Sequence, residues 1–219
     1  MFHVMLTLKK GEEVKYLSHR DVIRTFEFAL RRGKIPISYS EGFNPRPRMS
    51  FGSAIGVGVT SEDDRIQLEL TGPVEPSDIK AALNSQLPPG IRVLAAEIVI
   101  EGVKSPISKL NASEFRMSAS CNGCDLTCVK EAIAKLFSSE SIRVKRNIAD
   151  GGTKEVEIRP HLLSAEAAQE ENGDLSILVT LGYGHSGGAG PKDFVQAMTK
   201  VLPNLRVGSV HRVRQTARE

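Results

Sequence analysis

The chain has 219 residues, which is enough for one large domain or for two domains of about 100 residues each. Its hydrophobic fraction of 40% and charged fraction of 25%, with no apolar run near ~20 residues, exclude a disordered chain and a membrane protein. The formal net charge of +3 is too small to identify a nucleic-acid partner by itself. The N-terminus has no basic-then-apolar signal, so we expect a cytoplasmic protein.

The first half of the sequence predicts strands that alternate with two helices. The predicted strands are residues 2–9, 35–40, 49–59, 65–70 and 91–100, and the predicted helices are residues 18–33 and 75–87. Residues 103–111, which contain Gly, Pro, Ser and Lys, are the best candidate for a linker. The predicted order before this linker is therefore β-α-β-β-β-α-β.

The helix predicted at residues 18–33 has two different sides. Ser18 is the expected N-cap, Asp21 completes a capping box, and Gly33 is the expected stop. Helical periodicity gathers Val22, Phe26, Ala29 and Leu30 on one side, and Arg20, Arg24, Glu27 and Arg31 on the other. We therefore expect an amphipathic helix with a basic stripe.

The second half of the sequence has a similar order of elements. The predicted strands are residues 115–119, 142–148, 154–158, 175–181 and 205–213, and the predicted helices are residues 125–137 and 191–202. Two halves of similar order indicate an α+β fold with two ferredoxin-like lobes, each a mainly antiparallel sheet with helices on one face. The expected lobes are residues 1–102 and residues 112–219.

Residues 16–64 carry several short motifs that are specific as a group. They are Ser18-His19-Arg20-Asp21, Arg31-Arg32, Ile35-Pro36, Tyr39-Ser40, Gly42-Phe43-Asn44-Pro45 and Gly58-Val59. In these motifs the chain resembles the bacterial radical-SAM-linked proteins, a family of unknown function whose members occur fused to or beside radical SAM enzymes. The resemblance implies a radical SAM enzyme as a partner on a separate chain, but it implies no reaction for this chain. Arg46 stands where the family often has His.

Three cysteines, Cys121, Cys124 and Cys128, lie close together in the sequence. Their spacing differs from the radical SAM cluster motif, so this chain is not itself the radical enzyme. A zinc or iron–sulfur site is an alternative, but it lacks a second close pair of ligands. An odd number of cysteines does not form a disulfide framework. We therefore expect free thiols, no metal and no cofactor.

A group of arginine and aromatic residues predicts an RNA-binding surface, because Arg forks grip phosphates and aromatic faces stack on unpaired bases. The expected contacts are Arg20, Arg24, Arg31, Tyr39, Phe43, Asn44, Arg46 and Arg48, with Arg212 and Arg214 on one face of the last strand. The alternatives are that Phe43 plugs the core, that Pro45 and Pro47 only shape a turn, and that the C-terminal residues are a frayed end.

Residues 182–187 match a G-x-G-x-x-G pattern between a predicted strand and a predicted helix. Too few residues follow for the rest of a dinucleotide fold. Gly184, His185, Gly187 and Gly188 could instead cradle one phosphate, and a plain connector is the alternative. His19 falls toward the apolar side of its helix, so we expect a buried, hydrogen-bonded histidine there.

These patterns predict an accessory protein that binds tRNA or rRNA for modification by a partner radical SAM enzyme and has no catalytic residue of its own. One alternative is a metal-independent endoribonuclease that uses His19 or His185. No Ser-His-Asp group, paired-carboxylate motif or HExxH spacing supports that alternative. The other alternative is a protein adaptor, which would show an exposed apolar patch instead of a basic surface.

Overall fold

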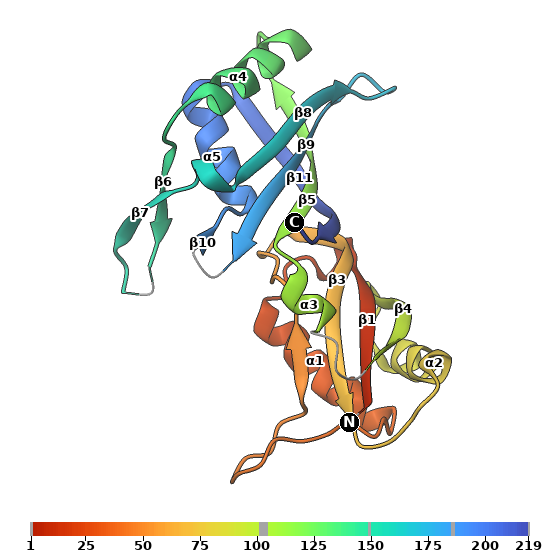
Figure 1. Ribbon diagram of the computed structural model, residues 1–219. Coiled ribbons are helices and arrows are strands. Elements are labelled where there is room, and N and C mark those ends of the chain that lie inside the picture. The colour runs from red at the N-terminus through yellow and green to blue at the C-terminus, as the bar shows by residue number, and fades with distance from the viewer. Residues whose placement is uncertain (1, 101–104, 149, 185–186, 219) are drawn as a thin grey trace. The chain divides into compact units, whose positions relative to one another are not determined.

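The computed structural model of the protein describes residues 2–100, 105–148, 150–184 and 187–218 (Figure 1). The chain divides into two compact units, which we call unit 1 (Met1–Leu110 with Ala217–Glu219) and unit 2 (Asn111–Thr216). Both units combine helices with antiparallel strands, so the mixed α+β class predicted from the sequence is confirmed. Among the described residues, no helix is long and apolar enough to cross a membrane.

Unit 1 has a sheet, two longer helices and a four-residue helix. Its elements are β1 (Phe2–Lys10), the 3-10 turn η1 (Glu12–Val14), α1 (His19–Arg32), β2 (Met49–Phe51), β3 (Val59–Leu70), α2 (Pro76–Gln86), β4 (Ile91–Val99) and α3 (Pro106–Lys109). Strand β1 pairs antiparallel with β3 and with β4, and β2 pairs antiparallel with β3. The strand order is therefore β4-β1-β3-β2.

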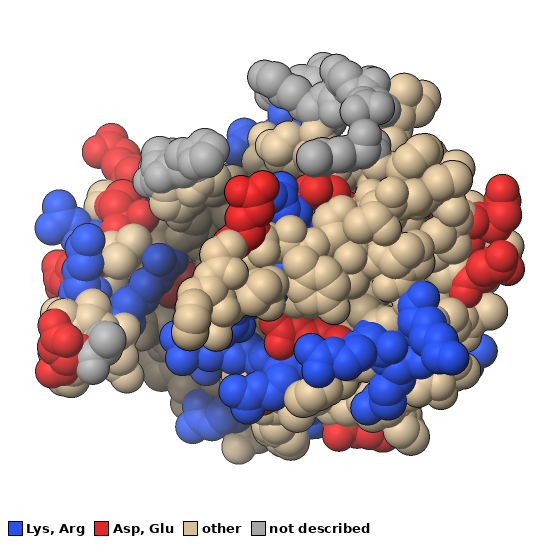
Figure 2. All heavy atoms as spheres, turned by 90° about the horizontal axis from the view of Figure 1, so that it is seen from below, with Lys and Arg blue, Asp and Glu red and all other residues tan. Residues whose placement is uncertain are grey.

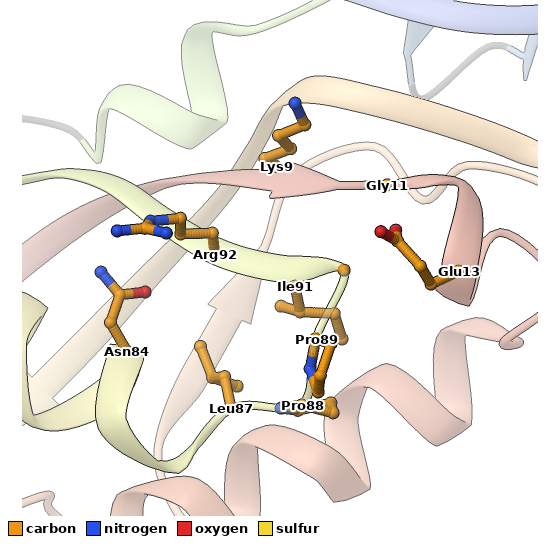
Figure 3. Close-up of a pocket in the computed structure, with 10 residues that line it drawn as sticks. Lys9, Gly11, Glu13, Asn84, Leu87, Pro88, Pro89, Ile91 and Arg92 are labelled. Atoms are coloured by element: carbon orange, nitrogen blue, oxygen red, sulfur yellow. The ribbon is translucent and has the colours of Figure 1, made fainter.

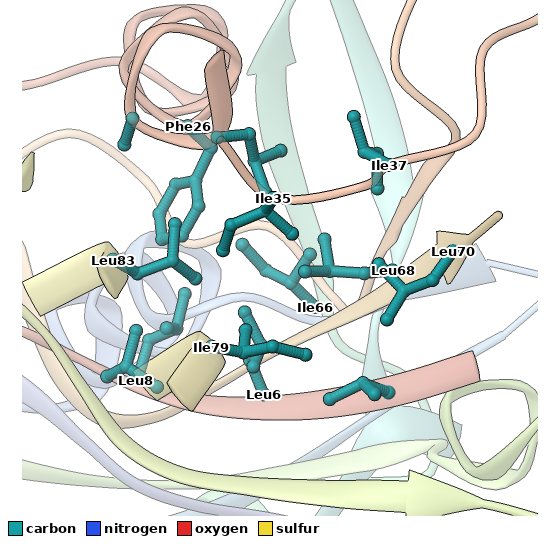
Figure 4. Packing of buried hydrophobic residues seen from close by; sticks show 14 of the residues in the cluster. Leu6, Leu8, Phe26, Ile35, Ile37, Ile66, Leu68, Leu70, Ile79 and Leu83 are labelled. Atoms are coloured by element: carbon teal, nitrogen blue, oxygen red, sulfur yellow. The ribbon is translucent and has the colours of Figure 1, made fainter. Parts of the chain in front are cut away.

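The core of unit 1 lies between the sheet and helices α1 and α2. Strand alternation directs Leu6 and Leu68 to the same face, where Phe26 of α1 and Leu83 of α2 pack on them (Figure 4). All four side chains are fully buried. Because side chains alternate along a strand, the neighbouring residues of β1 and β3 point to the other face of the sheet.

Three of the strands predicted in unit 1 differ from the observed ones. The strand predicted at residues 49–59 is shortened to β2 (Met49–Phe51), and the one predicted at residues 65–70 is part of the longer β3, which begins at Val59. The segment 35–40 forms only isolated bridges, Ile37 with Leu70 and Tyr39 with Pro47, because Pro36 has no N–H to donate to a ladder. The acidic run after residue 61 lies inside β3 instead of separating two strands. There Asp63 is buried and pairs with Arg65, so its charge is compensated within the strand.

A buried lysine fixes the start of α1. Lys10 is only 4% exposed, and its Nζ donates hydrogen bonds to the carbonyls of Lys15 (3.2 Å) and Leu17 (2.9 Å). The helix begins directly after this segment with the predicted capping box. The Ser18 hydroxyl accepts from the Asp21 N–H, and the Asp21 carboxylate accepts from the Ser18 N–H. The Ser18 hydroxyl also donates to the Asp21 carboxylate (2.6 Å), and this bond, followed by the one from the Ser18 N–H, lowers the pKa of Asp21.

Unit 2 contains a second antiparallel sheet and a separate hairpin. Its elements are β5 (Ala112–Cys121), α4 (Leu126–Ser138), β6 (Arg143–Asn147), β7 (Thr153–Glu157), η2 (Arg159–His161), β8 (Leu162–Gln169), β9 (Leu175–Gly184), β10 (Gly187–Gly188), α5 (Pro191–Val201) and β11 (Leu205–Thr216). Strand β5 pairs with β11 and β9, and β9 pairs with β8. The order β11-β5-β9-β8 therefore repeats the order of unit 1.

The hairpin of β6 and β7 forms a separate two-stranded sheet, although the sequence analysis counted residues 142–148 and 154–158 among the strands of the second lobe. It is joined to α5 by Arg146, which forms a bidentate pair with Asp193 (3.0 and 2.7 Å), and by Gln196, which exchanges hydrogen bonds with the backbone of Lys145. The strand that takes the expected place in the sheet is β8, which the sequence analysis missed. Its Ala, Leu, Glu and Gln residues favour a helix, and pairing with β9 overrides that preference.

The prediction of three free thiols is wrong. Cys121 and Cys124 form a disulfide at the end of β5, and Cys128 is free and half-buried in the first turn of α4. Gly123 between the bonded cysteines has φ of +78°, a conformation that glycine adopts without strain. The pattern C-x-x-C therefore forms a closed local loop at the N-terminus of α4.

We predict that replacing Lys10 with Met destabilises the protein by about 1–3 kcal/mol, because two carbonyl groups lose their buried donor. The free energy of unfolding, measured by urea denaturation followed by circular dichroism, tests this. The exposed Lys130→Met variant is the control and should stay within about 0.5 kcal/mol of the wild type. Equal stability of the two variants would contradict the role given to Lys10.

The hairpin should be sensitive to acid through Glu157. Hydrogen bonds from the Ser141 hydroxyl and from the N–H groups of Ile142 and Arg159 lower the pKa of Glu157 to about 2 from an ordinary 4.5. Below pH 4.5 the unfolded chain binds this proton first, so the stabilisation present above 4.5 is lost as the pH falls toward 2. In Glu157→Gln, urea denaturation at several pH values should show lower stability at pH 7 and a shallower fall below pH 4.5. Parallel curves for both proteins would rule out this effect.

Candidate nucleic-acid interface

The outer side of α1 carries the predicted arginines. Arg20, Arg24 and Arg31 are all exposed on this side, and the buried side consists of Phe26, Ala29 and Leu30. Figure 2 shows a band of Lys and Arg side chains across one face of the molecule, with Asp and Glu side chains beside it. The helix therefore presents its positive charge to solvent.

Phe28 is a member of this surface that the sequence analysis missed. Its side chain is 50% exposed although it belongs to a helix with a well-formed core side. It lies four residues after Arg24 and three before Arg31, so its ring neighbours both arginine side chains on the helix surface. Its helical position among the arginines was the signal that could have identified it.

The connection between α1 and β2 extends well away from both elements (Figure 1). Phe43 at its tip is 100% exposed, so the alternative that this ring plugs the core is excluded. The base of the connection is closed by hydrogen bonds from the Ser40 N–H to the Arg46 carbonyl (2.9 Å) and from the Arg46 N–H to the Ser40 hydroxyl (3.0 Å). Tyr39, 42% exposed, and the exposed Asn44 belong to the same connection.

Arg46 joins this connection to α1. Its guanidinium lies 3.7 Å from the carboxylate of Glu27, which sits on the helix three residues after Arg24 and four before Arg31. The ion pair offsets part of the positive charge, but Arg46 itself remains 77% exposed. This contact places the base of the connection next to the basic stripe of α1.

We call the stripe and the connection together the arginine–aromatic surface. It consists of Arg20, Arg24, Phe28, Arg31, Tyr39, Phe43, Asn44 and Arg46.

Arg48 is directed elsewhere. It donates to the Tyr39 carbonyl (3.3 Å) and pairs with Glu69 of β3 (3.5 Å). Together with His3 and Gln67 it lines a cavity of about 460 Å³ beside β2. The contacts of Arg48 are therefore with Tyr39 and β3, and none of them extends the basic stripe of α1 as expected.

The two arginines of the last strand do not form the expected face. Arg212 is 1% exposed, so the prediction that it contacts RNA at the surface is wrong. A register shift between Arg212 and Arg214 breaks the alternation that the prediction assumed. Arg214 is exposed but pairs with Glu114 at 3.0 Å. The last strand is also not frayed, since β11 pairs with β5 up to Thr216.

The glycine-rich segment lies at the β9–β10 hairpin, just before α5. Gly187 and Gly188 pair with Gly184 and Tyr183 in the short β9–β10 hairpin, and His185 lies outside the described residues. At the start of α5, the N–H of Gly190 donates to the carboxylate of Asp193 (2.7 Å). This carboxylate caps the helix and disfavours an anion at its first turn. The phosphate cradle of Gly184, His185, Gly187 and Gly188 stays a prediction, because residues 185–186 lie outside the described residues.

His19 is exposed, contrary to the expectation of a buried histidine. Its ring meets that of Phe51 edge to face, with centroids 5.1 Å apart. The structure shows no hydrogen bond from His19 to another described residue that would orient it for proton transfer. Within the described part of the chain, no group of three or more His, Cys, Asp and Glu side chains is arranged to hold a metal ion.

Similar solved structures agree with the α+β fold. One is a chain of the crystal structure of a Cbf5-Nop10-Gar1 complex, with a TM-score of 0.54 and 11% identity over 97% of this chain and 48% of that one. This protein thus spans about half of that chain, and a likeness at this identity shows the fold alone.

Two further matches have TM-scores too low to carry an argument. They are the first two RRM domains of yeast poly(U) binding protein (TM-score 0.22, 11% identity, 96% and 98% coverage) and an encapsulated DyP-type peroxidase from Mycobacterium smegmatis (0.22, 8%, 95% and 90%).

The sequence family gives the clearest relationship. No curated protein matches the chain. The model of one family, described as an uncharacterized protein conserved in bacteria (DUF2344), matches residues 3–191, and the chain belongs to this family.

Proposed function

We propose that this protein binds single-stranded RNA through the arginine–aromatic surface. The observation that carries the proposal is the complete exposure of Phe43 at the tip of a connection whose Arg46 pairs with Glu27 of the arginine-bearing helix. Burying a Phe side chain stabilises a protein by about 1.5–3 kcal/mol relative to leaving it in water. Stacking on a base also removes the ring from water. Phe28 provides a second ring between Arg24 and Arg31 for a neighbouring base.

The tip of the connection is prepared for this contact. Gly42 has φ of +117°, and Pro45 fixes its own backbone dihedral just after Asn44. The hydrogen bonds between Ser40 and Arg46 close the base of the connection. A tip held in this way loses less conformational freedom when it binds than a free loop would.

We also propose that a radical SAM enzyme on a separate chain carries out the chemistry on the bound RNA. This part rests on the sequence resemblance in residues 16–64, since the matched family has no described activity. The order β4-β1-β3-β2 and its repeat in unit 2 support a description of each unit as ferredoxin-like. Such sheets serve many functions, so the RNA proposal depends on the surface and not on the fold.

A protein adaptor is the second candidate, because unit 1 also has exposed apolar residues around β4. Phe2, Leu94, Ile98 and Ile100 are 48%, 38%, 66% and 75% exposed. Phe2 and Ile98 border a cavity of about 440 Å³ whose lining is mostly apolar. An exposed apolar patch of this kind marks many protein docking sites.

The RNA proposal predicts salt-sensitive binding of a 12-nucleotide single-stranded RNA, measured by fluorescence anisotropy. If Arg20, Arg24, Arg31 and Arg46 each neutralise a phosphate, log affinity should fall with log salt with a slope of roughly −3. The double variant Arg24→Ala/Arg31→Ala should flatten the slope by about 1.4. Phe43→Ala should weaken binding by about 1–3 kcal/mol without changing the slope, because stacking releases no counterions.

Two matched variants control this experiment. Arg116→Ala removes an exposed arginine from β5, and Phe2→Ala removes an exposed ring from β1. Neither belongs to the arginine–aromatic surface, so both should bind RNA like the wild type. Wild-type protein that shows no salt-dependent RNA binding would refute the proposal, as would equal losses in the control variants.

The adaptor candidate predicts that binding of the partner enzyme depends on the apolar residues around β4 and not on Phe43. Tagged protein expressed in a bacterium that carries its gene should capture a radical SAM enzyme, identified by mass spectrometry. Ile98→Glu places a charge in the apolar surface and should abolish capture, whereas Phe43→Ala should retain it. If Ile98→Glu captures the enzyme as well as the wild type does, this surface is not where the enzyme docks.

A further inference from the structure

A pocket lies at the end of the unit 1 sheet where β1 ends and β4 begins (Figure 3). Its volume is about 460 Å³. Lys9 of β1 and Arg92 of β4 supply its basic groups, and Glu13 supplies a carboxylate. Leu87 and Pro88, in the turn after α2, supply apolar surface. None of these five residues belongs to the arginine–aromatic surface.

The two basic residues are direct cross-strand neighbours. Lys9 pairs with Arg92 in the antiparallel register of β1 and β4, so both side chains leave the same face of the sheet. Like charges in this position destabilise a sheet. Both side chains are exposed, and no described residue forms an ion pair with either of them. The fold therefore keeps two like charges on directly opposite residues at the pocket, with no described carboxylate between them; in Figure 3 their charged ends point apart.

Glu13 does not compensate this pair, because it is held at the other end of the pocket. In Figure 3 its carboxylate points toward Gly11. A Cβ atom on Gly11 would lie 2.6 Å from the Glu13 Oε2 atom, and one on Gly90 would lie 2.9 Å from it. The carboxylate thus covers two glycines. It gives the pocket an acidic end that suits a hydrogen-bond donor.

The walls of the pocket are fixed by the backbone. The side-chain amide of Asn84 accepts from the Val93 N–H (2.8 Å) and donates to the Val93 carbonyl (3.0 Å), which ties the end of α2 to β4. The N–H of Gly11 donates to the carbonyl of Gly90 at 2.7 Å, which joins the end of β1 to the turn before β4. Pro88 in that turn has a restricted backbone. The pocket is therefore formed before any ligand arrives.

We propose that this pocket binds a small organic anion. Its carboxylate or phosphate group lies between Lys9 and Arg92, where it turns the repulsion between them into two attractive contacts. Its apolar body contacts Leu87 and Pro88, and a donor group on it faces Glu13. The site is independent of the RNA proposal, because its residues and its ligand class are different.

Isothermal titration calorimetry with two anions and their neutral counterparts tests the proposal. The probes are succinate against succinamide, and glycerol 3-phosphate against glycerol, so the two anionic groups are distinguished. At least one anion should bind at least tenfold more tightly than its neutral counterpart. Lys9→Gln and Arg92→Gln should each weaken that anion at least tenfold, and the exposed Lys130→Gln should not. Binding of neither anion, or unchanged binding in both pocket variants, overturns the proposal.

Thermal unfolding without added anion gives a second readout, which also shows that the variants fold. Lys9→Gln should melt at a higher temperature than the wild type, because the like-charge pair is gone. A lower melting temperature would show that the pair is not repulsive and would overturn the argument. Both variants should bind the 12-nucleotide RNA like the wild type. Loss of RNA binding together with no response to either small anion would assign Lys9 and Arg92 to the RNA surface instead.

Discussion

The ammonium group of Lys10 connects the sheet of unit 1 to the helix that carries the candidate site. It is buried, and it holds the carbonyls of Lys15 and Leu17 immediately before the Ser18 cap. A buried charge requires such partners, because an unpaired one would cost several kcal/mol. The position and direction of α1 therefore depend on a strand residue as well as on the core under the helix. The position of the α1 arginines therefore depends on Lys10 as well.

The strand that supplies Lys10 also supplies Lys9, and alternation sends the two side chains to opposite faces of the sheet. Lys10 is buried and acts in the structure, whereas Lys9 is exposed and lines the pocket next to Arg92. Two consecutive residues of one type thus have unrelated environments. Alternation from Leu6 and Leu8 indicates that Lys10 lies on the core side, but the carbonyl partners that allow its burial depend on the fold.

Local signals made much of unit 1 predictable. The start and the end of α1 are set by residues next to it in the sequence. The capping box of Ser18 and Asp21 marks its start and Gly33 marks its end, as predicted. The exposed connection with Phe43 could be read from its prolines and glycine in the same way. Features that depend on distant residues were missed. Examples are β8, whose composition favours a helix, and the burial of Arg212.

The repeated strand order also shows where each unit has acquired extra chain. In unit 1 the long connection runs from α1 to β2, and in unit 2 the β6–β7 hairpin lies between α4 and β8. Each links the first helix of its unit to an edge strand. Among the described residues of its own unit, β2 pairs only with β3, and β8 pairs only with β9. Chain can be added at this link without displacing an interior strand. Relatives of different length should therefore vary here first, and new binding specificities can arise at this link while the rest of the fold stays unchanged.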